Sequence, residues 1–555
     1  MGTRESTKKE VQFLAFPIDI GAVLAHLKQD MRDDWFPDPL LYKDIFDRPH
    51  DLEQLLTSML LEGNGQYIPV NRIPRDIPKS GLGLRYALET DFYDRFVLQA
   101  ICSYLMPYYD PLLSNRVLGH RFNPERTKEK YIFKHRIELW NTFQGITRAS
   151  LNTGKSLLCT DLINYFENIQ NDQIISSLSD NLSKVEANGI EKVRIRNAIT
   201  TLERLLKSWC YSDRHGLPQN RDASSFFANM VLNSVDQSMA AAGYDYYRYV
   251  DDIRIACSNE AQAKQALICL VRELRNVGLN INTSKTRIIS SGTSKEDLSI
   301  FFPAYDDRTI AIDNMWRSRS KRLIGKSVLY LHELLIELID KKETQSRQFR
   351  FCINRLSTLI SAKVFDCQSI LTPAVQDALL DLLIKEPVST DQACKILESA
   401  PDDAPVFSKI EQLLLTEEIA IHDWQNYLLW LLLAYKKHIR APLTELAKAQ
   451  CAEGPMRADF PAQLIYLAAA DESEYLIKLT DTYESNWPYQ ASRLLLISLT
   501  GMEESIIKPL AQKLDMKLRG TVKRIKSNGG IEGGLFHRES SMKFDELYER
   551  ISPYD

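Results

Sequence analysis

The sequence predicts an α+β chain in which a small sheet carrying acidic residues precedes a large all-α region. Two observations predict the sheet. Residues 246–257 place aromatic and β-branched residues on both sides of an Asp-Asp turn, and the apolar run 156–160 ends at Asp161. A third observation predicts the helical region, because apolar residues recur at helical spacing from about Trp316 to Met516. We expect this region to consist of stacked helix pairs of the solenoid kind.

Residues 246–257 are predicted to form a β-hairpin with carboxylates at its tip. On its second arm, apolar residues alternate with Arg254 and Ala256, the period of a strand with one buried face. Asp251 and Asp252 repel each other at the tip. A divalent cation would offset that repulsion, since Mg²⁺ takes one or two carboxylates together with substrate phosphates. The alternative is a solvated Asp-Asp turn with no function.

Asp161 follows an apolar run that reads as a buried strand, and the residues after it begin a helix. Asp161 is therefore predicted to lie at a strand end. Two strand-borne aspartates that converge can hold two cations roughly 3.5–4 Å apart, which activate an attacking hydroxyl and stabilise the leaving oxygen in phosphoryl transfer. This pattern predicts nucleotidyl-transfer chemistry.

At this point the sequence resembles the palm of reverse transcriptases, with Asp161 in the first catalytic motif and residues 249–252 in the third. The resemblance implies that Asp161, Asp251 and Asp252 are catalytic and bind two Mg²⁺ or Mn²⁺ ions, and that Tyr249 contacts the nucleotide. It also implies that Phe166, five residues after Asp161, lies beneath the sugar and selects deoxynucleotides. Phe166 could equally be a core residue of the helix after Asp161.

Two stretches that precede the hairpin also resemble reverse-transcriptase motifs. Residues 72–86 combine prolines, glycines and cations and are predicted to form a flexible basic hairpin. This stretch resembles the fingers, where Lys79 and Arg85 would grip the triphosphate of dNTPs. The alternative is that these two cations are solvated loop charges. Residues 216–219 match the motif that lines the nascent base pair, with Gln219 at its end.

Two departures concern the template and the primer. The family usually has glycine after the glutamine, whereas this chain has Asn220 followed by Arg221, so that side-chain bulk is expected beside the template. The primer-grip signature is missing, with residues 300–303 in its place.

Lys285 lies in a turn before a predicted strand, within a stretch that resembles the fourth palm motif. The resemblance implies that it protonates the leaving pyrophosphate, a general-acid role that contributes roughly 10²–10⁴-fold to the rate. The alternative is an ordinary surface lysine.

Composition limits the class of protein. A chain of 555 residues should hold more than one domain, and a net charge of −4 restricts any nucleic-acid contact to local sites. The longest apolar run, 427–435, is too short to span a bilayer, no secretory signal opens the chain, and the nine cysteines are scattered. We therefore expect a cytoplasmic protein with reduced thiols and no membrane partner.

The whole chain is predicted to divide into an N-terminal helical segment (1–70), fingers (71–150), a palm (151–310) and a helical, HEAT-like C-terminal domain (311–555). A reverse-transcriptase palm followed by a long helical domain resembles the abortive-infection (Abi) group of bacterial proteins. That resemblance implies anti-phage defence by a homo-oligomer that synthesises single-stranded DNA without a template, attached to a protein hydroxyl.

Tyrosine is the expected priming residue because its phenol ionises more readily than serine. Tyr42 near the amino terminus and Tyr554 at the carboxyl end are the first candidates, because both are expected to be flexible. Two alternatives remain open: an RNA-templated reverse transcriptase of retron or group II intron type, and an inactive palm that serves as a helical interaction scaffold.

Overall fold

The computed structural model describes residues 14–31, 34–70, 72–79, 81–125, 132–210, 215–294, 297–298, 301–302, 307–344, 346–362, 364, 370–416 and 421–527. Internal contacts group the chain into two compact units. The first comprises Met1–Asp34, Arg48–Pro74 and Ala87–Ala304, and the second comprises Trp35–Asp47, Arg75–Tyr86 and Tyr305–Asp555. The four domains predicted from the sequence stay a prediction.

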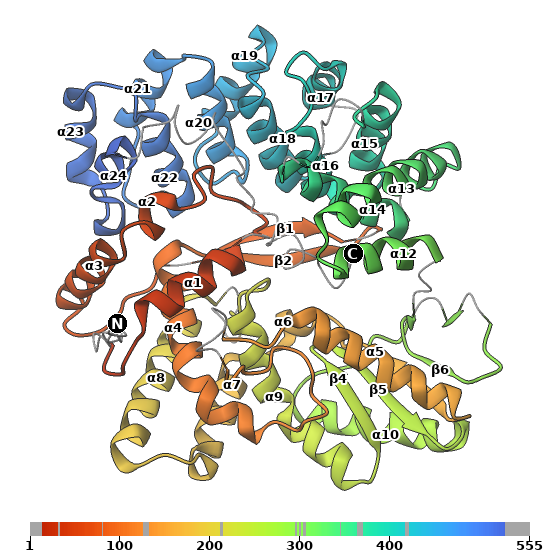
Figure 1. The fold of residues 1–555 in the computed structure, drawn as a ribbon. Helices are drawn as coiled ribbons and strands as arrows, with labels where there is room; N and C mark the ends of the chain where they lie inside the picture. Colours follow the sequence, from red (N-terminus) through yellow and green to blue (C-terminus); the bar gives the residue numbers. More distant parts are fainter. Residues whose placement is uncertain are drawn as a thin grey trace, which may run out of the picture. The chain divides into compact units, whose positions relative to one another are not determined.

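The first unit contains a four-stranded antiparallel sheet in the order β4-β5-β3-β6, with helices packed on it (Figure 1). The strands are β3 (Ser156–Thr160), β4 (Asp245–Tyr249), β5 (Asp252–Cys257) and β6 (Arg287–Ile289). The helices and helical turns of this unit are α1 (Ile20–Asp30), α3 (Pro49–Glu62), α4 (Phe92–Tyr109), η2 (Asp110–Leu112), α5 (Arg136–Asn152), α6 (Tyr165–Asn168), α7 (Asn171–Asn181), η3 (Leu182–Lys184), α8 (Gly189–Ser208), α9 (Asp222–Ala241) and α10 (Glu260–Asn276).

The predicted hairpin and the buried strand before Asp161 are confirmed as β4–β5 and β3. Strand β3 is buried along its whole length because β5 and β6 pair with its two edges. The prediction that β5 has only one buried face is wrong: Arg254 is 4% exposed and Ala256 is 7% exposed. Helix α5 covers that face, where Arg254 donates hydrogen bonds to Gln144 Oε1 (3.0 Å) and Thr147 Oγ1 (2.8 Å).

Two helices complete the packing of the sheet. Helix α9 contacts β4, and α10 contacts β5 and β3. Helix α10 covers the residues that follow the hairpin. It begins where the sequence provides a cap, because the Asn259 side chain accepts a hydrogen bond from the backbone N–H of Gln262 (2.9 Å).

The second unit is built almost entirely of helices, as the periodic C-terminal sequence predicts. They are α2 (Lys43–Phe46), α12 (Asp307–Arg317), α13 (Lys321–Asp340), α14 (Arg347–Ser361), α15 (Pro373–Lys385), η5 (Pro387–Ser389), α16 (Thr390–Leu397), α17 (Pro405–Leu415), α18 (Asp423–Tyr435), α19 (Ala441–Cys451), α20 (Phe460–Ala469), α21 (Ser473–Asp481), α22 (Tyr489–Ser498), α23 (Glu504–Lys513), η6 (Met516–Leu518) and α24 (Thr521–Ser527). Alternate helices pack together, α18 on α20 and α20 on α22. Whether they form HEAT-like repeats stays a prediction.

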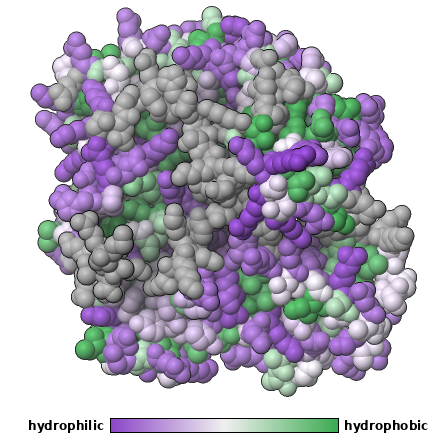
Figure 2. All heavy atoms as spheres, in the orientation of Figure 1, coloured by the Kyte–Doolittle hydropathy of each residue, from purple (hydrophilic) through white to green (hydrophobic). Residues whose placement is uncertain are grey.

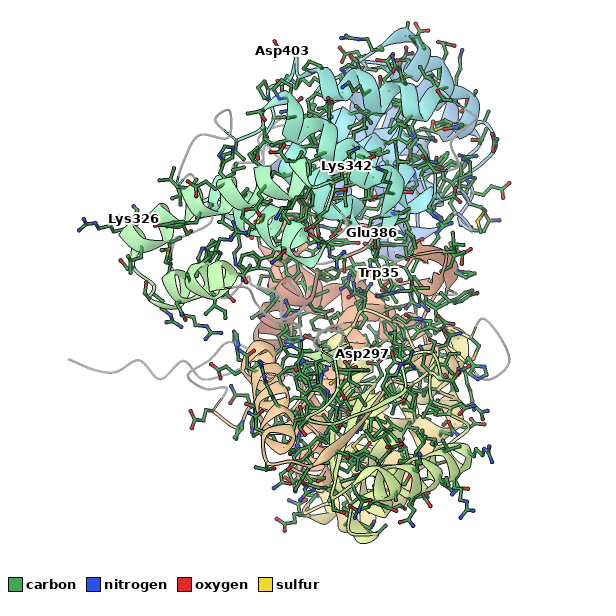
Figure 3. All side chains as sticks on the ribbon, turned by 90° about the vertical axis from the view of Figure 1, so that its right-hand side faces the viewer. Trp35, Asp297, Lys326, Lys342, Glu386 and Asp403 are labelled. Carbon is green, nitrogen blue, oxygen red and sulfur yellow. The ribbon has the colours of Figure 1, made fainter. Side chains whose placement is uncertain are left out.

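A segment from the N-terminal part of the chain, Trp35–Asp47, packs into this helical unit. Its first residue, Trp35, is labelled in Figure 3, and its carbonyl accepts a hydrogen bond from Trp424 Nε1 of α18 (2.6 Å). The hydroxyl of Tyr427 donates to the Pro37 carbonyl (2.8 Å). The predicted N-terminal helical segment is therefore shared between the two units.

Strands β1 (Ile73–Pro78) and β2 (Leu84–Glu89) form a separate two-stranded sheet. The turn between them is closed by a hydrogen bond from the Lys79 N–H to the Gly83 carbonyl (2.7 Å). The turn and the adjoining strand ends, Arg75–Tyr86, belong to the helical unit. The flexible basic hairpin that the sequence predicts is therefore present as a hairpin.

Within the described residues, no helix combines the length and the apolar character needed to cross a membrane. Figure 2 shows hydrophilic and apolar residues interspersed over the described part of one face. The cysteines that the structure describes are free thiols, in agreement with their scattered spacing.

Candidate active site

Asp161 and Asp252 are brought together by the register of two neighbouring strands. Strand β3 pairs with β5 up to Thr160, whose partner is Ile253. The next position along both strands places Asp161 opposite Asp252, just beyond the end of β3. Asp251 follows in the turn of the same hairpin, so the three predicted metal ligands lie at one end of the sheet.

The tip of the hairpin has a strained backbone. Tyr249 pairs with Asp252, so Val250 and Asp251 form a two-residue turn. Val250 has a φ of 57°, in the left-handed region that β-branched residues strongly avoid. Such a conformation costs on the order of 1–3 kcal/mol and persists only where the surroundings impose it.

A buried polar cluster imposes this conformation. Arg248 is fully buried and donates one hydrogen bond to the Val250 carbonyl (2.8 Å) and another to Asn229 Oδ1 (2.7 Å). Its Nε and Nη2 donate to the two oxygens of Asp236 at 2.9 and 2.7 Å. Burial disfavours the charge of Arg248, but Asp236 outweighs it and raises the pKa of Arg248 above its ordinary value. We call Arg248, Asp236 and Asn229 the hairpin clamp.

Gly119 extends the clamp to the outside of the turn. The amide of Asn229 donates a hydrogen bond to the Gly119 carbonyl (2.9 Å). A Cβ at Gly119 would lie 2.8 Å from Val250 Cγ2 and 2.9 Å from Val250 N, so only glycine fits there. The hairpin tip is thus held from both sides by groups that cannot move freely.

Lys285 reaches the same cluster from the loop before β6. The backbone of this loop runs beside Asp161, with the Asn282 N–H donating to the Asp161 carbonyl (2.8 Å). The ammonium of Lys285 donates a hydrogen bond to Asp161 Oδ2 (2.6 Å). Partial burial opposes its charge, but the bond to Asp161 raises the pKa of Lys285. Lys285 is therefore close enough to act on a group bound at Asp161.

The electrostatics of the cluster favour a bound cation. Burial, and then the charge of Asp251, raise the pKa of Asp252 to about 7. The other oxygen of Asp161, Oδ1, is buried and has no hydrogen-bond partner among the described residues. Asp161 therefore offers a buried oxygen without a partner in the described part of the chain, and the ionisation of Asp252 is disfavoured in the absence of a cation. Carboxylate oxygens in this situation are suitable ligands for hard divalent ions. The residues therefore fit the predicted magnesium or manganese site.

Phe166 and Gln219 lie on the segments that flank this cluster. In α6, the neighbouring Tyr165 is the buried residue, and its hydroxyl donates to the Ala228 carbonyl (2.9 Å). Phe166 is only partly buried, which leaves part of its ring available to a substrate. Gln219 Nε2 donates to Glu167 Oε1 at 3.3 Å, so the 216–219 motif contacts the turn of helix that carries Phe166.

The structure corrects the expected placement of Arg221. Asn220 has a φ of 56°, a conformation that asparagine tolerates and that glycine would also adopt. The Arg221 guanidinium turns toward Asp34 Oδ1 (3.3 Å) and Thr90 Oγ1 (3.3 Å), and its side chain is 12% exposed. Its bulk is therefore packed inside the first unit, and crowding of a template by Arg221 no longer follows.

Tyr249 is not placed for the predicted contact with a nucleotide. Its side chain is 2% exposed, and the ring packs against Trp140 of α5 with ring centroids 5.0 Å apart. Its hydroxyl donates to the Arg136 carbonyl (3.3 Å). The residue anchors the hairpin on α5.

The predicted fingers and primer-grip residues are placed separately. Lys79 and Arg85 lie in the β1–β2 hairpin, whose turn groups with the helical unit, and their role stays a prediction. Residues 300 and 303 lie outside the described residues. Phe302 is buried in the core beside the sheet, so it packs rather than gripping a primer.

Of the two expected priming tyrosines, Tyr554 lies outside the described residues. Tyr42 is 8% exposed, and the guanidinium of Arg493 lies over its ring, 4.6 Å from the centroid. The expectation that Tyr42 is flexible is therefore wrong.

The hairpin clamp is not among the features predicted from the sequence, although polar residues at helical spacing indicate it. Asn229, Asn233 and Asp236 recur at helical spacing along an otherwise apolar helix. Polar residues on a buried helix face require partners, and Arg248 on the adjoining strand provides one for Asn229 and Asp236.

One family model matches the part of the chain that carries this site. Residues 110–351 match the family model of reverse transcriptase (RNA-dependent DNA polymerase), a range that includes Asp161, Asp251, Asp252 and Lys285. Among solved structures, telomerase from Candida albicans in complex with a fragment of telomeric RNA is similar at 11% identity and a TM-score of 0.29. That match covers 69% of this chain and 64% of the telomerase chain. The chain thus contains a reverse-transcriptase-like domain over these residues.

Proposed function

We propose that the chain is a DNA polymerase in which Asp161, Asp251 and Asp252 hold two Mg²⁺ or Mn²⁺ ions. The observation that carries the proposal is the meeting of Asp161 and Asp252 across β3 and β5, with an unpartnered buried oxygen on Asp161. In the proposed reaction a primer hydroxyl attacks the α-phosphorus of a dNTP, a new P–O bond forms, and pyrophosphate leaves. When bound, the ions activate the hydroxyl and stabilise the leaving oxygen.

Lys285 is proposed to donate the proton that the leaving pyrophosphate takes up. Its ammonium already lies at the cluster, 2.6 Å from Asp161 Oδ2, and its side chain is 64% exposed, so it can turn toward a bound triphosphate. Lys79 and Arg85 of the β1–β2 hairpin are proposed to bind that triphosphate, as the resemblance to polymerase fingers implies.

Replacing Asp251 tests the metal assignment. Asp251→Asn keeps the side-chain volume and removes a charged ligand, so nucleotide incorporation should be lost while thermal unfolding is preserved. Asp245→Asn is the matched control, because Asp245 lies at the opposite end of β4, where it pairs with Arg116 and Lys155. This control should retain activity. Near-normal incorporation by Asp251→Asn would refute the proposal.

Phe166 is proposed to select the sugar, because it is partly exposed in the helical turn that follows Asp161 whereas Tyr165 fills the core. Phe166→Ala should admit ribonucleotides. The control is Tyr165→Phe, which removes a buried hydroxyl from the neighbouring residue and should leave sugar selectivity unchanged. If Phe166→Ala lowers only stability, the core interpretation is correct.

We further propose that the enzyme acts in bacterial anti-phage abortive infection, in the cytoplasm and as a homo-oligomer. The support is the resemblance of a reverse-transcriptase palm followed by a long helical region to the Abi group. Template-independent, protein-primed synthesis is part of this proposal, and the missing primer-grip signature supports it. The buried position of Arg221 removes the argument from template crowding.

One experiment separates this proposal from its rivals. Nuclease-treated protein is incubated with labelled dNTPs and Mg²⁺ without a template, and the product is analysed by denaturing electrophoresis before and after protease. Label that migrates with the protein until protease is added supports protein priming. Label that appears only with added RNA and copies its sequence supports a retron or group II intron type of enzyme. No incorporation under any condition supports the inactive scaffold.

A further inference from the structure

A second group of metal-binding side chains lies in the first unit, at the start of α9. His26 Nε2 lies 3.3 Å from Asp222 Oδ2, and His120 Nε2 lies 3.1 Å from Asp222 Oδ1. Asp30, one helical turn after His26 on α1, accepts a hydrogen bond from the Asp222 backbone N–H (3.1 Å). Ligand atoms of His26, Asp30 and Asp222 all lie within 4.8 Å of one another.

In this group, His26 is buried although its imidazole has no hydrogen-bond partner among the described residues. Its side chain is 4% exposed, and its ring packs beside Phe133 with ring centroids 5.2 Å apart. Although Nε2 is close to Asp222, neither ring nitrogen has a hydrogen-bond partner among the described residues. Because a buried polar group left unpaired is unfavourable, an imidazole in this position favours a bound ligand.

The balance of charges around His26 also favours a bound cation. Arg95 pairs with Asp30 (3.0 Å) and Asp34 (2.5 Å), and Arg221 pairs with Asp34 (3.3 Å). Two guanidinium groups thus face three carboxylates, since Asp222 completes the set. With neutral histidines, one negative charge remains in a poorly solvated site.

We propose that His26, Asp30 and Asp222 bind a divalent transition-metal ion of the zinc type, and that His120 fixes the second oxygen of Asp222. Zinc lies about 2.0–2.2 Å from imidazole nitrogen and carboxylate oxygen, so ligand atoms in one coordination shell lie roughly 3–4.5 Å apart. The ligand atoms of the three side chains lie within 4.8 Å of one another, so small side-chain movements bring them into one coordination shell. Mixed nitrogen and oxygen donors favour zinc over the magnesium expected at the all-carboxylate catalytic cluster.

Such an ion would join two segments of the first unit directly, α1 and the start of α9, and the loop that carries His120 through Asp222. Helix α9 also carries Asn229 and Asp236 of the hairpin clamp. The ion is therefore assigned a structural role, distinct from the catalytic ions.

The test is metal binding by the full-length protein. The chain is stripped with a chelator, dialysed, and titrated with Zn²⁺ and separately with Co²⁺, which reports coordination geometry by visible absorption. With Mg²⁺ in large excess to occupy the catalytic carboxylates, Zn²⁺ should bind as one ion per chain and raise the unfolding temperature, and Co²⁺ should give the absorption of a site with a nitrogen ligand. A large excess of Mg²⁺ should not displace either ion.

Variants locate the ion within the chain. His26→Gln should abolish the Co²⁺ absorption and the thermal shift, and His120→Gln should weaken binding by roughly 10–100-fold, the usual effect of losing a group that supports a ligand. Two controls should bind normally: His50→Gln, which removes an exposed histidine, and Asp161→Asn, which disables the proposed catalytic site. Asp161→Asn also keeps this test independent of the proposed polymerase activity.

The unmodified protein alone can overturn the proposal. Absence of saturable Zn²⁺ binding, or binding with no change in unfolding temperature, would overturn it. Zn²⁺ binding that His26→Gln leaves unchanged would place the ion elsewhere.

Discussion

Asp252 is a buried residue whose surroundings disfavour the charge of its carboxylate. Its pKa is raised from 3.8 to about 7, first by burial and then by the charge of Asp251. Between these two values the folded protein holds a proton that the unfolded chain releases. The free energy of unfolding therefore falls as pH rises from about 4 to about 7, and the loss is complete above that range.

A metal-free comparison of pH profiles checks this prediction. Asp252→Asn stays neutral, so above about pH 7 it should unfold at a higher temperature than the unmodified protein, and near pH 4 the difference should vanish. Adding Mg²⁺ should reverse the order at high pH, because only the carboxylate gains from the cation. An Asp252→Asn variant that is less stable at every pH would contradict the assigned charge state.

The same titration predicts how activity depends on pH. Protons compete with metal ions for Asp252, so at limiting Mg²⁺ the rate of incorporation should rise as pH increases through about 7. Saturating Mg²⁺ should move the midpoint to lower pH. A midpoint that does not respond to the Mg²⁺ concentration would assign the titration to another group.

The tip of the β4–β5 hairpin is held by Arg248 of β4 and by residues outside the hairpin. The strained Val250 is held by Arg248 and by the close approach of Gly119. Gly119→Ala would place a Cβ less than 3 Å from the backbone nitrogen of Val250, and backbone cannot give way as a flexible side chain can. The turn that carries Asp251 must shift.

We therefore predict that Gly119→Ala lowers incorporation by roughly 10²-fold, the cost of misplacing a catalytic group by about 1 Å. The matched control is Gly145→Ala in α5, where a Cβ would meet nothing within 4 Å. This control should keep full activity and gain about 0.5–1 kcal/mol of stability, because alanine favours helix over glycine. Equal activity of the two variants would show that the turn tolerates displacement.

The elements of the palm were predictable where one local pattern decides the structure. Asp161 follows a run that is apolar on both faces, and Asn259 caps the helix after the hairpin, so β3 and α10 follow from neighbouring residues alone. The burial of Arg254 did not follow, because a pattern of alternation cannot reveal that α5 covers the second face. From the sequence alone, an arginine whose hydrogen bonds go to distant side chains cannot be distinguished from one that is exposed to solvent.

The same limit applies to the site. Residues 249–252 predicted a cluster of carboxylates, but the anchoring role of Tyr249 depends on Trp140, more than a hundred residues earlier. Arg221 likewise turned inward because Asp34 and Thr90 pack beside it. Residue type and spacing predicted which chemistry is present, whereas long-range packing decided which side chains face it.

At the scale of the whole chain, residues that are neighbours in the sequence can belong to different compact units. Trp35–Asp47 lies near the N-terminus but packs into the C-terminal helical unit. Its attachment is a buried ion cluster: Arg493 of α22 donates hydrogen bonds to both oxygens of Asp38 (2.6 and 3.2 Å) and of Asp44 (2.7 and 3.2 Å). All three side chains are 1% exposed.

Removing Arg493 should release this segment. Arg493→Met fills a similar volume but leaves Asp38 without its cation and Asp44 with only the more distant Arg524 (3.7 Å), and breaking a buried pair in this way costs about 3–5 kcal/mol. Hydrogen exchange should therefore accelerate in residues 35–47 and in α22. The control is Lys385→Met, which removes an exposed pair with Asp381 worth at most about 1 kcal/mol and should leave the exchange pattern unchanged.

A triple variant distinguishes charge from packing as the source of this effect. If the loss comes from uncompensated charge, replacing Asp38 and Asp44 by Asn in the Arg493→Met background should recover much of the stability, because neutral amides cost less to bury than carboxylates. If packing around Arg493 dominates, the added substitutions should recover nothing. Unchanged exchange in residues 35–47 after Arg493→Met would instead show that hydrogen bonds such as that from Trp424 to the Trp35 carbonyl are enough to hold the segment.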